Sequence, residues 1–319
     1  MDDAYAACCL CLSAFTRDFR ASEAVWPIPL LAQLTRTLRL TAQHSSSKLT
    51  DAGSQLMKCF PATYLASSRE KRLATLQVVN AAFKIYFRLN TLRLCKNMIA
   101  SVESRNALPF DEYSVSQKVT YKFYTGRLAV FDEDYCKAEK DLSYAFTHCH
   151  ASAVKNQGRV LRYLVPVKLL LGHLPSPALL ARFPDLACYA PVATAVRTGD
   201  VRALNAALDD GQEEFIRAGT YLLLEKLKAG VYRTLLKRIH AMQREREPAK
   251  AFQLHISLFQ RALSWLGVDM DLDECECVLA NLIYRKYVKG YLSHKARVVV
   301  LSKASPFPKL STVSFDEPA

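Results

Sequence analysis

The sequence predicts a mainly α-helical protein, in which a solenoid of tetratricopeptide-like helical hairpins leads into a C-terminal winged helix. Apolar residues recur at steps of three and four along most of the 319 residues, which is the spacing of one helix face. Only ten residues are glycine, which argues against a glycine-looped nucleotide enzyme. Between Val288 and Leu301 the apolar period changes to two, which predicts a β-hairpin.

Composition narrows the classes of partner. The formal net charge is +13, and such a surplus attracts nucleic acid, acidic proteins or anionic membranes. The alternative is a solvated basic surface that keeps the protein soluble. We find no run of about 18 apolar residues, so no membrane span is expected. The acidic start Met1-Asp2-Asp3 does not resemble a signal peptide, so the ten cysteines are expected to be reduced and packed as small apolar side chains.

The N-terminal segment, residues 1–54, is expected to be helical but poorly anchored. Residues 1–40 have helical spacing, and the Ser-rich stretch from Gln43 to Ser54 predicts a polar linker. The cluster of Cys8, Cys9 and Cys11 has no second Cys/His pair at a zinc spacing, so we expect these side chains to pack. This segment is therefore the part of the chain that we expect to be mobile.

Helical repeats are predicted for residues 55–216. From Arg69 apolar stripes pair into helices, with a break at Leu89-Asn90 and an end at Pro109. The clearest hairpin joins 116–131 to 132–148. Its small and large positions follow the tetratricopeptide pattern, at Gly126, Tyr135, Ala138, Leu142 and Ala145. Further helices are expected at 159–172, interrupted by Pro166, at 177–183, at 186–198 and after the cap Asp200.

A winged helix is predicted for residues 217–304, followed by a tail at 305–319. The first helix has an apolar stripe at Leu223, Leu224, Leu227, Val231, Leu235 and Ile239. The second has Leu254, Leu258, Ala262, Trp265 and Leu266. The third opens with a capping box, Asp271 with Glu274, and buries Cys275, Val278, Leu279, Leu282 and Ile283. The hairpin turns at His294-Lys295-Ala296-Arg297.

Motifs of catalysis are absent from the sequence. There is no phosphate loop, dinucleotide fingerprint, nucleophile elbow or paired-His zinc helix. His148, Cys149 and His150 are adjacent, so on a helix they point about 100° apart and do not converge on one metal ion. A calcium loop that would start at Asp269 fails because Glu274 stands where a glycine is required. We therefore expect no enzyme, no cofactor and no metal.

Basic residues of the winged helix form the predicted nucleic-acid surface. They are Lys237, Arg238, Arg285, Lys286, Lys289, Lys295, Arg297 and Lys303. The third helix begins with acidic residues that would repel phosphate, which argues against reading of bases in the major groove. Phosphate contact with little base discrimination is expected instead. Tyr284, Tyr287 and Tyr291 either stack on bases or pack under the wing, and Lys286 either lies past the helix end or snorkels.

Several strings give the chain a resemblance to a known family. They are Phe83-Lys84-Ile85-Tyr86-Phe87-Arg88-Leu89-Asn90, Val119-Thr120-Tyr121-Lys122-Phe123-Tyr124, Tyr163-Leu164-Val165-Pro166-Val167-Lys168, Leu279-Ala280-Asn281-Leu282-Ile283-Tyr284 and Pro306-Phe307-Pro308. Together they resemble the PCI domain-containing protein 2 family, over roughly residues 70–313. Residues 1–60 fit the resemblance poorly. The family has a helix-stopping glycine near the position of Lys286.

The resemblance implies a subunit of the transcription-and-export complex 2 at the nuclear pore. It implies that the winged helix pairs with that of a large scaffold PCI subunit, that a small acidic disordered subunit shared with the proteasome lid braces the assembly, and that RNA and possibly DNA bind. The expected place is the nucleus and nuclear pore, with some protein in the cytoplasm. The alternative is a PCI scaffold subunit of a proteasome-lid or signalosome-type complex without a nucleic-acid role. An enzyme with an unrecognised site and a lone DNA-binding regulator are weaker alternatives.

Overall fold

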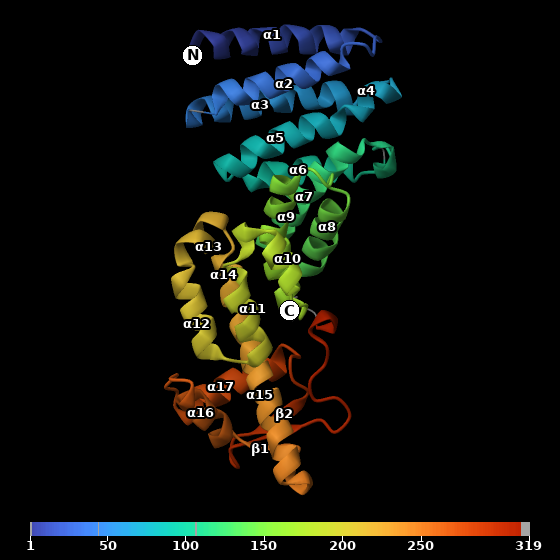
Figure 1. Cartoon of the computed structure of the whole chain (residues 1–319). Coiled ribbons are helices and arrows are strands. Elements are labelled where there is room, and N and C mark those ends of the chain that lie inside the picture. Colours follow the sequence, from blue (N-terminus) through green and yellow to red (C-terminus); the bar gives the residue numbers. More distant parts are fainter. Residues whose placement is uncertain (1, 44, 106, 314–319) are drawn as a thin grey trace. The chain divides into compact units, whose positions relative to one another are not determined.

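The structure is a computed structural model that describes residues 2–43, 45–105 and 107–313. It is mainly helical with one small sheet near the C-terminus, as predicted (Figure 1). The chain forms two compact units. The first comprises Met1–Leu128 with Tyr144–Cys149, and the second comprises Ala129–Ser143 with His150–Ala319. No helix of the described residues is long and apolar enough to span a membrane.

The first unit is a stack of helices around one continuous apolar core (Figure 1). Its helices are α1 (Asp2–Ala21), α2 (Ile28–Ala42), α3 (Ser46–Tyr64), α4 (Arg69–Leu73), α5 (Thr75–Leu89), α6 (Leu92–Val102) and most of α7 (Val115–Phe131). The break predicted at Leu89-Asn90 is confirmed, because Asn90 takes the left-handed conformation that ends α5. Buried Leu12, Leu38, Leu56 and Phe83 come from four different helices.

The linker predicted at Gln43 to Ser54 is wrong, because α3 begins at Ser46. Its serines lie at the start of the helix, and Leu49, Ala52 and Leu56 follow as a buried stripe at helical spacing. Gly53 lies against Tyr86 of α5, where an added Cβ would be 2.8 Å from the ring carbon Cε1. The Tyr86 hydroxyl donates to the Gly53 carbonyl at 2.9 Å, which fixes α3 on α5.

The expectation of a poorly anchored N-terminus is also wrong. Leu12 and Phe19 of α1 are almost completely buried. The ammonium of Lys71 in α4 donates to the Phe19 carbonyl at 2.6 Å and to the Ser22 carbonyl, and it lies 4.4 Å from the centroid of the Phe19 ring. A buried cation thus caps the carbonyls at the end of α1 and holds that helix to the unit.

The second unit begins with further repeat helices. They are most of α8 (Tyr135–Thr147), then α9 (Val154–Leu170), α10 (Pro177–Arg182), α11 (Tyr189–Thr198), α12 (Val201–Asp210) and α13 (Gln212–Ala218). The first helix of the predicted hairpin ends at Phe131 as expected, and the second begins at Tyr135, three residues later than the predicted 132. The predicted cap is confirmed, since the Asp200 side chain accepts from the Ala203 amide. The interruption predicted at Pro166 is wrong. α9 continues through it because Pro166 and both its neighbours are buried, so that packing offsets the lost hydrogen bond.

The winged helix is confirmed in its order of elements. It consists of α14 (Tyr221–Glu225), α15 (Leu227–Arg246), β1 (Gln253–His255), α16 (Ile256–Trp265), α17 (Leu272–Tyr284), β2 (Gly290–Ser293) and β3 (Val298–Leu301). The three strands form an antiparallel sheet in the order β1-β3-β2. Val299 of β3 is opposite Leu254 of β1 and Leu292 of β2.

The predicted buried face of the second helix is wrong in its phase. Leu254 lies in β1, and α16 starts only at Ile256, because the His255 side chain caps it by accepting from the Ser257 amide. The buried face is therefore Ile256, Phe259, Leu263 and Leu266. Trp265, which was expected inside, is 81% exposed.

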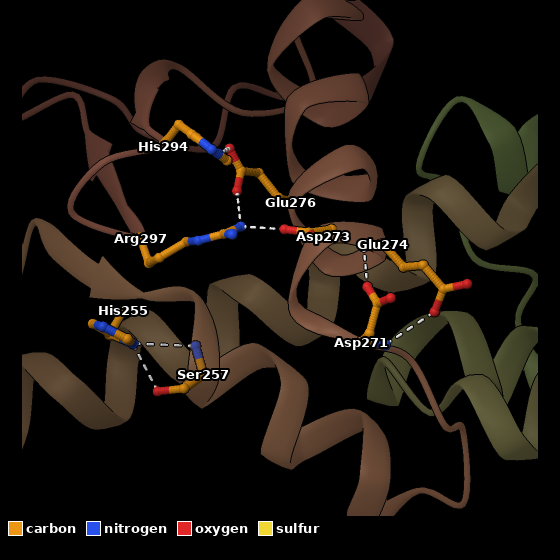
Figure 2. A network of polar contacts seen from close by, with 8 residues as sticks. All are labelled: His255, Ser257, Asp271, Asp273, Glu274, Glu276, His294 and Arg297. Carbon is orange, nitrogen blue, oxygen red and sulfur yellow. Dashed lines mark hydrogen bonds and ion pairs between the residues drawn. The ribbon is translucent and has the colours of Figure 1, made fainter.

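The first and third helices follow their predicted patterns more closely. In α15, Leu227 and Val231 are buried as predicted, and Leu236 is buried as well. Leu235 and Ile239, which were expected on the buried face, are only half-buried. An added Cβ at Gly199 would be 2.7 Å from the Leu235 backbone nitrogen, so α15 is covered on this side by the α11–α12 turn. The capping box of α17 is confirmed (Figure 2). Asp271 accepts from the Glu274 amide at 2.7 Å, and Glu274 accepts from the Asp271 amide at 2.9 Å.

Candidate functional site on the winged helix

Most of the predicted cations of the winged helix are available to solvent. Lys237, Arg238, Arg285, Lys286, Lys289, Lys295 and Lys303 are exposed, whereas Arg297 is half-buried. The first two lie on α15, and the others lie between α17 and β2, in the turn of the wing and just after β3. The cations from residue 285 onward thus belong to the connections around the small sheet, whereas Lys237 and Arg238 are presented by a helix.

Arg297 differs from the others because it is bound to the acidic start of α17 (Figure 2). Its Nη1 lies 2.5 Å from Asp273 Oδ1 and 2.5 Å from Glu276 Oε2, and these carboxylates raise the pKa of the guanidinium, Asp273 most strongly. Glu276 is also 2.8 Å from His294 Nδ1. The four side chains form a clasp, which we call the wing clasp. It offsets part of the negative charge that was expected to repel phosphate, and it uses the charge of Arg297 for that purpose.

The end of α17 holds Lys286 and Lys289 in fixed backbone positions. Lys286 lies past the helix end, with a left-handed φ of 60°, and the following amide of Tyr287 donates to the Leu282 carbonyl at 2.9 Å. The Lys289 amide donates to the Pro306 carbonyl at 2.8 Å, and its carbonyl accepts from the Ser302 amide at 2.8 Å. Both side chains are therefore presented to solvent by a backbone that hydrogen bonds hold in place.

The three tyrosines divide between the two roles considered for them. Tyr287 is 5% exposed, and burial raises the pKa of its phenol, so it packs under the wing. Tyr284 and Tyr291 are 61% and 63% exposed. Only these two rings have the exposure that stacking on a base requires.

Arg233 lies on the same helix as Lys237 and Arg238, but it is not a surface cation. Arg233 is buried, and burial lowers the pKa of its guanidinium. Its Nε donates to the Tyr287 carbonyl at 3.1 Å and its Nη2 to the Pro308 carbonyl at 2.5 Å. Its Cζ lies 5.9 Å from the centroid of the Phe307 ring. Arg233 therefore fastens both the end of α17 and the C-terminal tail to α15. Its spacing to Leu236 and His240, three and then four residues, was the signal for a buried face.

His240 is a second buried polar residue that the sequence did not single out. Its ring lies 5.7 Å from Phe252 and 5.6 Å from Phe307, centroid to centroid. Burial, and then the charge of Arg244, lower the pKa of the imidazole, and Nε2 is buried with no hydrogen-bond partner among the described residues. The neutral ring therefore serves as packing between the tail and α15. Across the described part of the chain, no group of three His, Cys, Asp or Glu side chains is placed to hold a metal ion.

Comparison with known proteins agrees with this architecture. The model of the PCI domain family matches residues 208–303, which hold the winged helix. The PCI domain-containing protein 2 of Danio rerio is 41% identical over 98% of this chain and 80% of its own length. The enhanced ethylene response protein 5 of Arabidopsis thaliana is 43% identical over 94% of this chain and 74% of its own. The protein CSN12 homolog of Mycosarcoma maydis is 34% identical, over 95% of this chain and 74% of its own length.

The helical repeats, the winged helix and the family match define a PCI-domain protein, of the class whose members act as subunits of protein complexes. This chain belongs to the PCI domain-containing protein 2 family. The resemblance seen in the sequence is thereby confirmed. With two of the relatives the similarity extends over 98% of the chain, which is more than residues 70–313. None of these relatives is named as an enzyme.

Proposed function

We propose that this protein is a non-enzymatic adaptor subunit of a nuclear mRNA-export complex that couples transcription to export. In this proposal its winged helix pairs with that of a large scaffold PCI subunit and contributes a basic surface for nucleic acid. Membership in the PCI domain-containing protein 2 family supports the role of a complex subunit. The observation that carries the nucleic-acid part is the set of exposed cations between α17 and β2 and on the wing, beside carboxylates whose charge Arg297 partly offsets.

The chemistry of this surface favours contact with phosphate over reading of bases. Lys286, Lys289 and Lys295 present point charges from connections rather than a helix face that could enter the major groove. The exposed rings of Tyr284 and Tyr291 would add stacking that tolerates any base. We therefore expect binding with little dependence on sequence, better suited to single strands than to a specific duplex site.

The partners follow from the same proposal. Trp265 is a large exposed apolar side chain on the winged helix, of the kind that anchors protein interfaces, and we assign it to the contact with the scaffold PCI subunit. The net charge of +13 suits the small acidic disordered subunit, shared with the proteasome lid, as a second partner. A role in export places the protein in the nucleus and at the nuclear pore, with some in the cytoplasm.

The nucleic-acid surface is tested by replacing Lys286, Lys289 and Lys295 together with glutamine. Arg297 is kept, because its removal would open the wing clasp and confuse loss of contact with loss of structure. Affinities for unrelated single-stranded RNAs, measured by filter binding at several salt concentrations, should fall alike. The slope of log affinity against log salt should become shallower by about two, at roughly 0.7 for each lost phosphate contact.

The matched control replaces Lys137, Lys140 and Lys155 with glutamine. These residues are also exposed, but they lie on α8 and α9, and their replacement changes the net charge by the same amount. The control should keep the salt slope of the original protein. If both triple variants bind RNA equally well, the surface has been misassigned. The alternative of a PCI scaffold subunit without a nucleic-acid role would then be favoured.

A further inference from the structure

The net positive charge is larger in the N-terminal unit than in the unit that carries the winged helix. The N-terminal unit has 17 Lys and Arg against 9 Asp and Glu, a net charge of +8, and the other unit has a net charge of +5. Four helices of the N-terminal unit, α2, α5, α6 and α7, contain no acidic residue at all. Their cations are Arg36, Arg39, Lys84, Arg88, Arg93, Lys96, Lys118, Lys122 and Arg127.

Four of these cations form a cluster on two helices that pack against each other. Arg36 and Arg39 are three residues apart on α2, and Lys84 and Arg88 are four apart on α5, so each pair shares a helix face. Arg36, Lys84 and Arg88 are exposed, and Arg39 is half-buried. Partial burial, and then the charges of Arg39 and Arg36, lower the pKa of Lys84. We call these four residues the α2–α5 cluster.

The cluster has no internal counter-charge. Within the described residues, none of its four side chains forms an ion pair or a side-chain hydrogen bond, and no carboxylate contributes to the shifted pKa of Lys84. Elsewhere in the same unit cations do pair with carboxylates. For example, Arg69 forms an ion pair with Glu112 at 3.0 Å. Like charges held together without compensation reduce the stability of the fold. An anion that covers the cluster would relieve this repulsion.

We propose that the α2–α5 cluster binds the phosphodiester backbone of a nucleic acid, as a contact surface separate from the winged helix. The inference builds on the proposed function for the class of ligand, and it adds a second site to it. A long polyanion fits better than an acidic protein, because the acid-free character continues from α2 and α5 onto α6 and α7. Three of the four residues of the cluster are arginines, whose planar guanidinium matches phosphate oxygens in bidentate geometry.

The test replaces Arg36, Arg39, Lys84 and Arg88 with glutamine in the full chain. The probe is a labelled 30-nucleotide polyuridine, and its affinity is measured by fluorescence anisotropy between 50 and 300 mM KCl. Loss of about four phosphate contacts should make the slope of log affinity against log salt shallower by about three and should weaken binding at low salt by at least about tenfold. A duplex DNA of mixed sequence in a parallel titration shows whether the phosphodiester comes from RNA or DNA.

Two control variants separate contact from folding and from net charge. Replacing Lys137, Lys140, Lys155 and Arg159 with glutamine removes four exposed charges from other helices and should leave the salt slope unchanged. Changing Arg36, Arg39 and Arg88 to lysine keeps the charge. This variant should retain most of the slope of log affinity against log salt. The melting temperature of the glutamine variant should equal or exceed that of the original protein at low salt, because repulsion has been removed. If the fourfold glutamine variant unfolds, the double variants R36Q/R39Q and K84Q/R88Q are measured in its place. Each should make the slope of log affinity against log salt shallower by half as much.

The results distinguish this inference from the proposed function. If the winged-helix triple variant loses RNA affinity and the α2–α5 variant does not, the inference is overturned and the proposed function stands. If instead the α2–α5 variant loses RNA affinity and the winged-helix triple variant does not, the inference is supported and the winged helix is not the nucleic-acid surface. Polyglutamate of matched charge is the competitor. If it displaces polyuridine from the cluster as well as RNA does, the occupant is an acidic protein and the inference is again overturned.

Discussion

Single residues fix the geometry of the wing, and Gly290 is the strictest of them. A Cβ at this position would lie 2.2 Å from the Val300 carbonyl oxygen and 3.1 Å from Leu301 Cα. Both are backbone atoms of β3, so neither can move without disturbing the sheet. Gly290 thus permits the close approach of β2 to β3 that carries the turn with Lys295.

Gly290→Ala should therefore destabilise the protein by roughly 2–3 kcal/mol, as overpacking does in a closely packed site. Urea unfolding of the variant and the original protein measures the difference. Gly230→Ala is the control, because Gly230 lies inside α15 with nothing within 4 Å of an added Cβ. That change should be neutral or stabilise by up to about 1 kcal/mol. Equal stability of the two variants would contradict the packing seen at Gly290.

Lys286 is a second residue whose backbone matters as much as its charge. A lysine with a φ of 60° ends α17, in the position that glycine fills most often. Lys286→Gly should stabilise the protein by about 1 kcal/mol while it removes one predicted phosphate contact. Arg285→Gly is the control, since Arg285 has a φ of −74° and should gain nothing from glycine. Thermal melts and RNA binding of the two variants, taken together, separate the backbone effect from the charge effect.

Among the elements, the wing is held to α17 by the wing clasp rather than by apolar contacts alone. Arg297→Gln should lower the melting temperature, because Asp273 and Glu276 would face one another without their cation. The effect should shrink in high salt, which screens their repulsion. Lys295→Gln, in the same turn but exposed, should leave the melting temperature unchanged. A salt-independent loss in the Arg297 variant would mean that the clasp acts through shape and not through charge.

The packing of the C-terminal tail on α15 should make stability depend on pH through His240. The folded protein holds the pKa of this imidazole below its ordinary value near 6.5, whereas the unfolded chain takes up the proton at that value. The contribution of the neutral His240 side chain to stability is therefore fully present above about pH 6.5. This contribution is lost as the pH falls through the folded pKa. His240→Phe should flatten this loss between about pH 7 and 5 in urea unfolding. A parallel pH dependence in the two proteins would assign the acid sensitivity to other groups.

At the scale of the whole molecule, the N-terminal helices are a packed part of the first unit and not an appendage. Lys71 joins α4 to the carbonyls that end α1, and it is almost completely buried. Lys71→Met should cost about 1–3 kcal/mol, because the buried Phe19 carbonyl and the Ser22 carbonyl lose their donor. Hydrogen exchange should then accelerate in the last turns of α1. The control Lys58→Met changes an exposed lysine of α3 and should leave exchange in α1 as it was.

The order of elements was predictable because it depends on local rules. The capping box at Asp271, the left-handed stop at Asn90 and the change of period before β2 each act within a few residues of sequence. The same holds for the exposed cations of the connections, since charged side chains outside an apolar stripe remain in solvent. Family membership also followed from strings of adjacent residues.

The sequence by itself determined most of the helices, the hairpin of the wing, where the charge is concentrated, and the family. Only the tertiary structure decided which side of a helix is covered. It buried Arg233 and Lys71, exposed Trp265, carried α9 through Pro166, and tied Arg297 to the carboxylates of α17. The physical reason is that burial and ion pairing depend on neighbours distant in sequence. A cation beside two carbonyl oxygens is stable inside, and the same cation beside water is stable outside.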